Sequence, residues 1–195
     1  MSAKVLIVAE HDGARLNAST AKCVTCARQL SGAEIAIVVC AADGAAVAAQ
    51  AAQLAGVTRV ITIDNPANAH ALAALLAPQI VAVSEPFTHL LGPSTTFGKD
   101  LMARIAGLLG APQVSDIMAI ESATRFRRPI YAGNAILTVE VNGAPKLIGT
   151  VRTASFEAPT RIGSCEAFSS VSGFLPASVA KPRILSQDFL KASGR

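Results

Sequence analysis

The stretch Lys4-Val5-Leu6-Ile7-Val8-Ala9 is a continuous apolar run that starts at a charged residue and is followed by Glu10. A strand that is buried on both faces has this pattern, whereas a half-exposed strand alternates apolar and polar residues. Residues 34–40, with the sequence EIAIVVC, repeat the pattern. These two runs predict a parallel sheet that helices cover on both faces.

Segments with helical spacing of apolar residues separate the predicted strands. Asn17, Ser19 and Thr20 offer helix caps before residues 21–30, and Gly32 ends that helix. Further helices are predicted over 43–54, 68–76 and Thr96–Leu109, and further strands over 59–63, 79–84 and 114–120. This alternation predicts right-handed crossovers between parallel strands.

The pattern changes after Glu121, where three consecutive strands are predicted over 126–131, 135–141 and 146–153. Asn142-Gly143 is a strong hairpin signal between the last two, and Gly133-Asn134 marks the turn before them. The predicted fold is therefore α/β and Rossmann-like, a doubly wound and mainly parallel sheet with helices on both faces. Antiparallel strands are added in the carboxy-terminal third.

One domain is predicted over residues 1–180. Residues 161–178 are rich in Ser and Gly and are interpreted as a loop. Residues 181–195 are interpreted as an arm or linker, because 181–191 look extended and partly charged and the chain closes on Ala192-Ser193-Gly194-Arg195.

The composition is that of a folded domain with a sizeable core. Of the 195 residues, 51% are hydrophobic and only 15% are charged, which excludes an intrinsically disordered chain. The net charge of +4 is mild, and the basic residues are scattered apart from Arg125, Arg127 and Arg128, so no nucleic-acid interface is predicted. No apolar run is long enough to span a bilayer and no targeting segment is evident. We therefore expect a cytoplasmic protein without membrane insertion.

Cys23 and Cys26 form a C-x-x-C pair, which can indicate a redox pair or half of a zinc site. No second pair or nearby histidine supplies further ligands, and the pair falls within a predicted helix. Buried helix packing is therefore favoured, with no metal site. With Cys40 at a strand end and Cys165 in a polar stretch, no disulfide is expected in a reducing cytoplasm.

The sequence GPSTTFGKD at 92–100 follows a predicted strand and opens a predicted helix. Ser94, Thr95 and Lys99 are therefore candidates for holding an anion or nucleotide at a helix amino terminus. The spacing is not that of a Walker A loop, and Asp100 stands where Ser or Thr would bind magnesium. The alternative is a helix start that is merely capped by Ser or Thr.

Glu10 and His11 follow the first predicted strand and are the other candidates for binding a nucleotide. The turn lacks the G-x-G-x-x-G glycines that let a pyrophosphate approach the backbone, so a solvated turn is favoured. His89 is placed in a loop over 85–91 with no nucleophile partner. No catalytic residues are predicted, because paired carboxylates and nucleophile–base pairs have no support.

The segment from Phe126 to Ala135 has the densest cluster of bulky and basic side chains. Rings and arginines on one element favour a protein interface or an ordered polar network, and a plain edge strand is the alternative. The candidate interface residues are Phe126, Arg127, Arg128, Tyr131 and Asn134.

Several motifs together resemble electron-transfer flavoprotein alpha subunits. They are VLIVAEH at 5–11, GKDLMAR at 98–104, APQVSDI at 111–117, RPIYAGNA at 128–135 and VRTASF at 151–156. These motifs match the family in order and spacing over nearly the whole chain.

The resemblance implies the amino-terminal domain of an alpha subunit that pairs with a beta subunit. Such proteins carry electrons from dehydrogenases, often the acyl-CoA dehydrogenases of fatty acid beta-oxidation, to a membrane quinone oxidoreductase. The family holds FAD mainly in a carboxy-terminal domain whose motifs do not occur in this sequence, so no FAD ligand is expected here. The implied role is a scaffold and interaction domain without catalysis of its own.

Two further expectations accompany this interpretation. Without its partners the chain should expose apolar patches, which self-association would cover. The alternative function is a Rossmann-like domain that binds AMP or ATP near 10–13 and 92–99, an analogy at the level of the fold.

Overall fold

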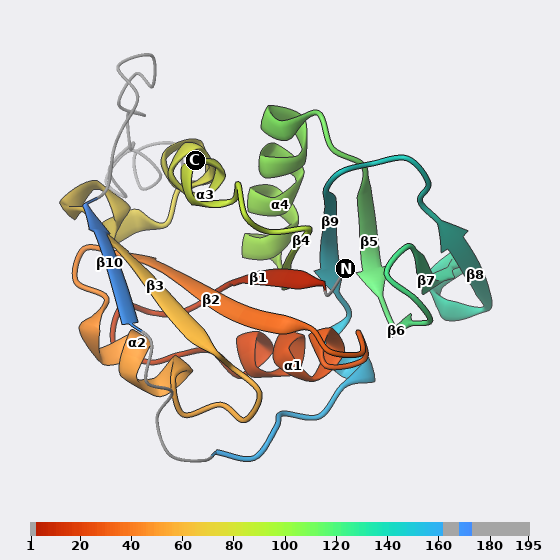
Figure 1. Ribbon diagram of the computed structural model, residues 1–195, viewed down its shortest axis with the longest axis horizontal. Helices are drawn as coiled ribbons and strands as arrows, with labels where there is room; N and C mark the ends of the chain where they lie inside the picture. Colours follow the sequence, from red (N-terminus) through yellow and green to blue (C-terminus); the bar gives the residue numbers. More distant parts are fainter. Residues whose placement is uncertain (1–2, 162–167, 173–195) are drawn as a thin grey trace, which may run out of the picture.

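The computed structural model describes residues 3–161 and the backbone of the strand 168–172. The predictions for Cys165 and for residues 173–195 lie outside the described residues. Within this part the predicted α/β class is confirmed: a parallel sheet carries helices on both faces, and a small antiparallel sheet stands beside it (Figure 1).

In the part of the chain that the structure describes, seven strands form the main sheet in the order β10-β3-β2-β1-β4-β9-β5, and every neighbouring pair is parallel. Their bounds are Lys4–Val8 (β1), Glu34–Ala41 (β2), Arg59–Asp64 (β3), His89–Pro93 (β4), Gln113–Ile117 (β5), Leu147–Val151 (β9) and Phe168–Ser172 (β10). The central strands are buried on both faces, as their continuous apolar runs indicated.

Within the described residues, four α-helices cover the sheet, two on each face. They are α1 (Ala18–Ala27), α2 (Ala45–Ala51), α3 (Ala73–Val83) and α4 (Thr96–Leu109). Buried residues of α1 and α2 pack with Val5 and Ile7, whereas those of α3 and α4 pack with Leu6 and Val8. Alternate side chains of β1 thus enter opposite cores, and Figure 1 shows the two helix pairs on opposite sides of the sheet.

Local signals fix several helix ends. The Asn17 side chain accepts a hydrogen bond from the Ser19 amide and caps α1. Thr95 caps α4 by accepting from the Gly98 amide, and Gly110 ends that helix in the left-handed conformation, at φ 58°. The predicted and observed bounds of α4 coincide, whereas α1 begins and ends three residues before the predicted 21–30.

The strand predicted over 79–84 is wrong. Residues 79–83 belong to α3, which contains Pro78, Ser84 is its C-cap, and the next strand is β4. Gln79 and Ile80 are buried, and the Gln79 side chain donates to the Leu75 carbonyl. Packing of the apolar helix therefore overrides the interruption that Pro78 signals. His89 accordingly begins a buried strand and does not lie in a loop.

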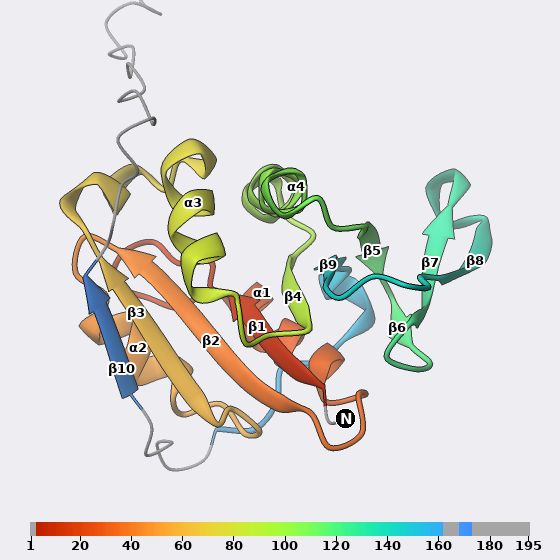
Figure 2. The same cartoon turned by 45° about the horizontal axis from the view of Figure 1, so that its top comes forward.

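The small sheet has the order β6-β7-β8, with the bounds Ala119–Ile120, Arg125–Ile130 and Ala135–Glu140. The hairpin predicted at Gly133-Asn134 joins β7 to β8. The hairpin predicted at Asn142-Gly143 is wrong: β9 leaves β8 and enters the main sheet between β4 and β5. Figure 2 shows the β7–β8 hairpin at the side of the main sheet beyond β5.

Part of the loop predicted over 161–178 is also a strand. Residues Phe168–Ser172 form β10, which pairs in parallel with β3 at the sheet edge. The serine-rich sequence FSSVS gave no strand signal, and its pairing with an available edge decides its conformation.

Candidate functional site

The strand order reverses between β1 and β4, because β2 and β3 extend the sheet from one side of β1 and β4 begins the other side. In open α/β sheets, ligands bind at the carboxyl ends of the strands at such a switch point. The fold therefore brings the turn after β1 close to the start of α4, and both predicted anion-binding segments lie there.

Side chains of the protein itself occupy the turn after β1. The Glu10 carboxylate accepts a hydrogen bond from the Ser19 hydroxyl at 2.7 Å, and Asn17 caps α1. A carboxylate at this point repels a phosphate, and the capped helix end offers fewer free amides to it. These described residues do not fit the pyrophosphate of a dinucleotide such as FAD.

His11 is also held within the turn. Its Nδ1 accepts from the Gly13 amide at 3.0 Å, and its Nε2 lies 3.1 Å from the Cys40 carbonyl oxygen, to which it donates. Burial lowers the pKa of His11, so the neutral ring with a proton on Nε2 satisfies both contacts.

The second candidate segment, residues 92–100, contains one side chain that the fold uses and others that it does not. Thr95 is used as the α4 cap, and Lys99 is exposed. The Ser94 Oγ is buried without a hydrogen-bond partner among the described residues. The hollow beside His11, about 440 Å³, is lined also by Asp43 and His70 and does not include Ser94, Thr95 or Lys99. The candidates therefore do not form one pocket.

The described ranges 3–161 and 168–172 give little support for a metal site, a membrane span or a reactive cysteine. They contain no cluster of His, Cys, Asp or Glu that could hold a metal ion. They also contain no helix long and apolar enough to cross a bilayer. Cys23, Cys26 and Cys40 are buried free thiols, and burial raises the pKa of Cys40 to about 12. Such thiols are poor nucleophiles.

The more unusual geometry lies at the other edge of the molecule, in a notch of about 490 Å³. Here we call it the arginine notch. Its lining comes from the tip of the β7–β8 hairpin, the end of β5 and the residue after β9, and consists of Asp116, Arg128, Pro129, Ile130, Tyr131, Ala132, Gly133 and Arg152. Sequence reasoning singled out Arg128 and Tyr131 but missed Asp116 and Arg152. The signal for these two is that they lie in motifs of the family resemblance, Asp116 in residues 111–117 and Arg152 in residues 151–156.

The backbone around the arginine notch is strained. Among the described residues, four that are not glycine have a positive φ, and three of them, Asp116, Tyr131 and Ala132, line this notch. A bulge in the β5–β9 pairing accompanies the left-handed Asp116, whose amide donates to the Thr150 hydroxyl at 2.9 Å. Clustered strain of this kind is typical of functional sites.

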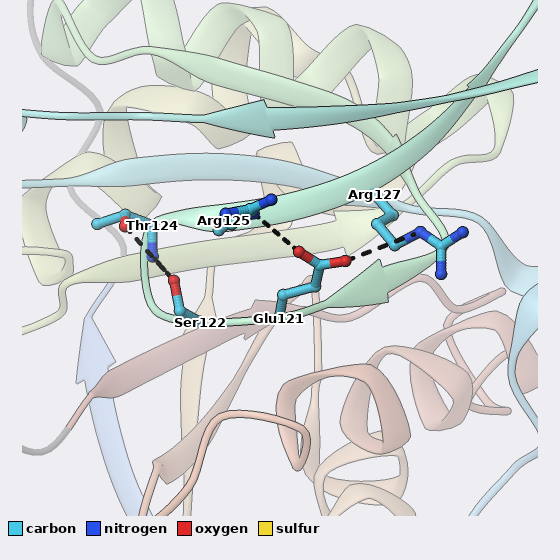
Figure 3. A network of polar contacts seen from close by, with 5 residues as sticks. All are labelled: Glu121, Ser122, Thr124, Arg125 and Arg127. Atoms are coloured by element: carbon cyan, nitrogen blue, oxygen red, sulfur yellow. Dashed lines mark hydrogen bonds and ion pairs between the residues drawn. The ribbon is translucent and has the colours of Figure 1, made fainter.

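Two other arginines of β7, Arg125 and Arg127, lie near the carboxylate of Glu121 (Figure 3). Glu121 lies 2.9 Å from the Nε of Arg125 and 3.9 Å from that of Arg127. Arg152 lies 3.4 Å from Asp116. The described residues contain no ion pair for Arg128, and its buried Nε lacks a hydrogen-bond partner there.

The other interface candidates differ in exposure. Tyr131 is 79% exposed, and Asn134 is exposed at the end of the hairpin turn. Phe126 is fully buried, with its ring centroid 6.5 Å from that of His89. We therefore remove Phe126 from the interface candidates, because its large ring completes the core under the hairpin.

We predict that acid destabilises the fold through His89, which is buried, and His11, which is half-buried. Burial lowers the pKa of His11 and His89 from 6.5, so the unfolded chain binds protons more readily than the folded chain. The stability they provide is present above pH 6.5 and is lost as the pH falls toward their folded pKa values. Each can contribute up to about 1.4 kcal/mol per pH unit in that range.

The test is thermal melting between pH 7.5 and 5. The variant His89→Gln should show a shallower pH dependence than the wild type. The matched control is His70→Gln, because His70 is exposed. An identical slope in all three proteins contradicts the prediction.

The described geometry defines a Rossmann-like α/β domain whose first strand–helix turn is closed, with a strained basic notch at its edge. A family model described as "Electron transfer flavoprotein domain" matches residues 5–170. The chain therefore belongs to this family, which confirms the resemblance of its motifs.

The similar proteins are alpha subunits of electron transfer flavoproteins. The electron transfer flavoprotein subunit alpha of Pseudomonas aeruginosa is 40% identical over 188 residues, which cover 96% of this chain and 60% of that protein. The mitochondrial subunit alpha of Dictyostelium discoideum is 38% identical over 173 residues, 85% of this chain and 48% of that protein. The Paracoccus denitrificans subunit alpha is 39% identical over 155 residues, 79% of this chain and 49% of that protein. The chain corresponds to the amino-terminal domain of these alpha subunits and spans about half to three fifths of their length.

Proposed function

We propose that this chain is the scaffold and interaction domain of an electron transfer flavoprotein alpha subunit and that it pairs with the beta subunit of that protein. The complete protein carries electrons from acyl-CoA or other dehydrogenases to a quinone oxidoreductase of the respiratory chain through FAD. In this proposal the FAD is held mainly by residues outside this sequence, the domain has no catalysis of its own, and the protein works in the cytoplasm.

The observation that carries the proposal is the closed turn after β1. The domain has the fold of a dinucleotide-binding protein, but Glu10, Asn17 and His11 use this turn for internal hydrogen bonds. A domain of a flavoprotein that cannot place FAD at its own switch point is suited to support a flavin bound elsewhere.

A second candidate is a domain that binds AMP or ATP. The hollow of about 440 Å³ at the carboxyl ends of β1 and β2 favours it by position and size. Asp12 and Asp43 line this hollow, and their negative charges oppose a phosphate. We therefore prefer the scaffold function.

Thermal shift measurements with excess FAD, AMP or purified beta subunit separate the two functions. A partner that binds only the folded chain at a hundred times its Kd adds about 2.7 kcal/mol, or roughly 5–10 °C in Tm. We expect this shift with the beta subunit and none with FAD or AMP. A shift with AMP and none with the beta subunit contradicts the scaffold function and supports the second candidate.

A further inference from the structure

The arginine notch contains more positive than negative charge. Arg128 and Arg152 supply two cations, and Asp116 is the one carboxylate among the described lining residues. Asp116 lies 3.4 Å from Arg152, so its charge is already engaged. Arg128 faces the notch without a carboxylate.

Arg128 differs from its neighbours on the same strand. Arg125 and Arg127 are exposed and lie near Glu121, as Figure 3 shows. The Nε of Arg128 has been removed from water, and no acceptor in the described chain replaces that water. Because the chain itself covers this Nε, an external partner would bind the terminal nitrogens of the guanidinium, which lines the notch. A carboxylate that accepts hydrogen bonds from both terminal nitrogens is the strongest partner for an arginine, and it would offset the cost of the unsatisfied buried donor.

Apolar side chains adjoin this charge. Leu137 is the cross-strand neighbour of Arg128, so the two side chains share one face of the hairpin, and Leu137 is 43% exposed. Tyr131 at the tip is 79% exposed. Tyrosine and arginine beside exposed aliphatic residues are typical of the central residues of protein interfaces. A small free anion would leave these side chains in water, whereas a protein surface would cover them.

We propose that the arginine notch is a docking site for an Asp or Glu side chain on the surface of the beta subunit. The carboxylate binds Arg128 in the bidentate manner, and the surface around it packs on Tyr131 and Leu137. The proposal rests on the proposed function, since it names the place and the chemistry of that subunit contact.

The strained turn suits this role. Tyr131 and Ala132 have φ values of 50° and 56° before the partner arrives, and Gly133 follows at 99°. A turn that is already held in its bound conformation loses less conformational freedom when it binds.

The test measures the affinity of the full chain for the purified beta subunit by isothermal titration calorimetry. Arg128→Met keeps an unbranched, flexible side chain but removes the guanidinium and its charge, and Tyr131→Ala removes the exposed ring. We expect Arg128→Met to weaken binding at least about 30-fold, because one partner of a desolvated charge pair is lost. Tyr131→Ala should weaken binding at least about 10-fold. The control is Arg125→Met, which removes a charge on the same strand that Glu121 already pairs, and it should bind within about 3-fold of the wild type.

The outcomes separate the two proposals. If the wild type binds and both Arg128→Met and Tyr131→Ala bind equally well, the arginine notch is not the contact, and the proposed function stands. If the wild type does not bind the beta subunit, the proposed function fails and the docking site fails with it.

Titration with inorganic phosphate provides a third arm. Phosphate binding that Arg128→Met abolishes, with unchanged beta-subunit binding, overturns protein docking in favour of a small anion. Tyr131 is exposed and outside the core, so Tyr131→Ala keeps the test decisive if Arg128→Met does not fold.

Discussion

Gly98→Ala is expected to destabilise the domain by at least about 3 kcal/mol and to lower its Tm by roughly 6–12 °C. A Cβ atom at Gly98 would lie 1.8 Å from the carbonyl oxygen of Pro93. That oxygen belongs to the backbone of β4, which is buried in the middle of the sheet, so no side chain can rotate to make room. The helix α4 must move away from the sheet, and its contacts through Leu101 and Met102 weaken.

Gly107→Ala is the matched control for this prediction. Gly107 lies in the same helix and is exposed, and a Cβ there meets no atom within 4 Å. Alanine favours the helix over glycine by about 0.5–1 kcal/mol, so the control should melt at or above the wild-type temperature. Both variants are compared by thermal and urea unfolding. Equal stability of Gly98→Ala and the wild type would mean that α4 does not approach Pro93 this closely.

Gln79→Leu is expected to cost about 1–3 kcal/mol of stability, although it replaces a polar side chain in a core by an apolar one. Gln79 and Asn68 are each 2% exposed, and the Gln79 Nε2 donates to the Asn68 Oδ1 at 2.8 Å. The substitution leaves that oxygen buried without its donor. It also removes the bond to the Leu75 carbonyl in the helix that contains Pro78.

A double-mutant cycle distinguishes this cause from a simple change of volume. Asn68→Ala together with Gln79→Leu removes both amides, so no unsatisfied partner is left behind from the pair. The double variant should therefore lose less stability than the sum of the single variants, by at least about 0.5 kcal/mol in urea unfolding. Strict additivity would show that the two amides do not depend on each other.

The arginine notch and the closed turn after β1 differ in whether their polar groups have partners within the domain. The turn satisfies its own polar groups, through Glu10 and His11, and so leaves little for a ligand to bind. The notch leaves the Arg128 Nε unsatisfied and Tyr131 exposed. Polar groups without internal partners are where a folded protein gains most from an external one.

The local elements that could be predicted from the sequence are those with strong local signals. In β1 and β2 the signal is a continuous apolar run, which is typical of a strand buried on both faces. In α4 the signal is a capping threonine at the start and a glycine after the last turn. The wrong strand at 79–84 arose where an apolar, β-branched run follows Pro78. Such a run is compatible with a buried helix or a buried strand, and only its packing against the sheet decides between them.

The amino-acid sequence by itself determined the α/β class, most of the helices and strands, and the membership of the family, because these depend on periodicity and on motifs within short segments. The tertiary structure alone decided where β9 goes. The turn at Asn142-Gly143 permits pairing with β8, but β9 is buried throughout and gains more between β4 and β5. That insertion brings Arg152 to Asp116 and both to the hairpin that carries Arg128. These residues are far apart in the sequence, and a notch that depends on pairing between distant strands has no local signal from which it could be predicted.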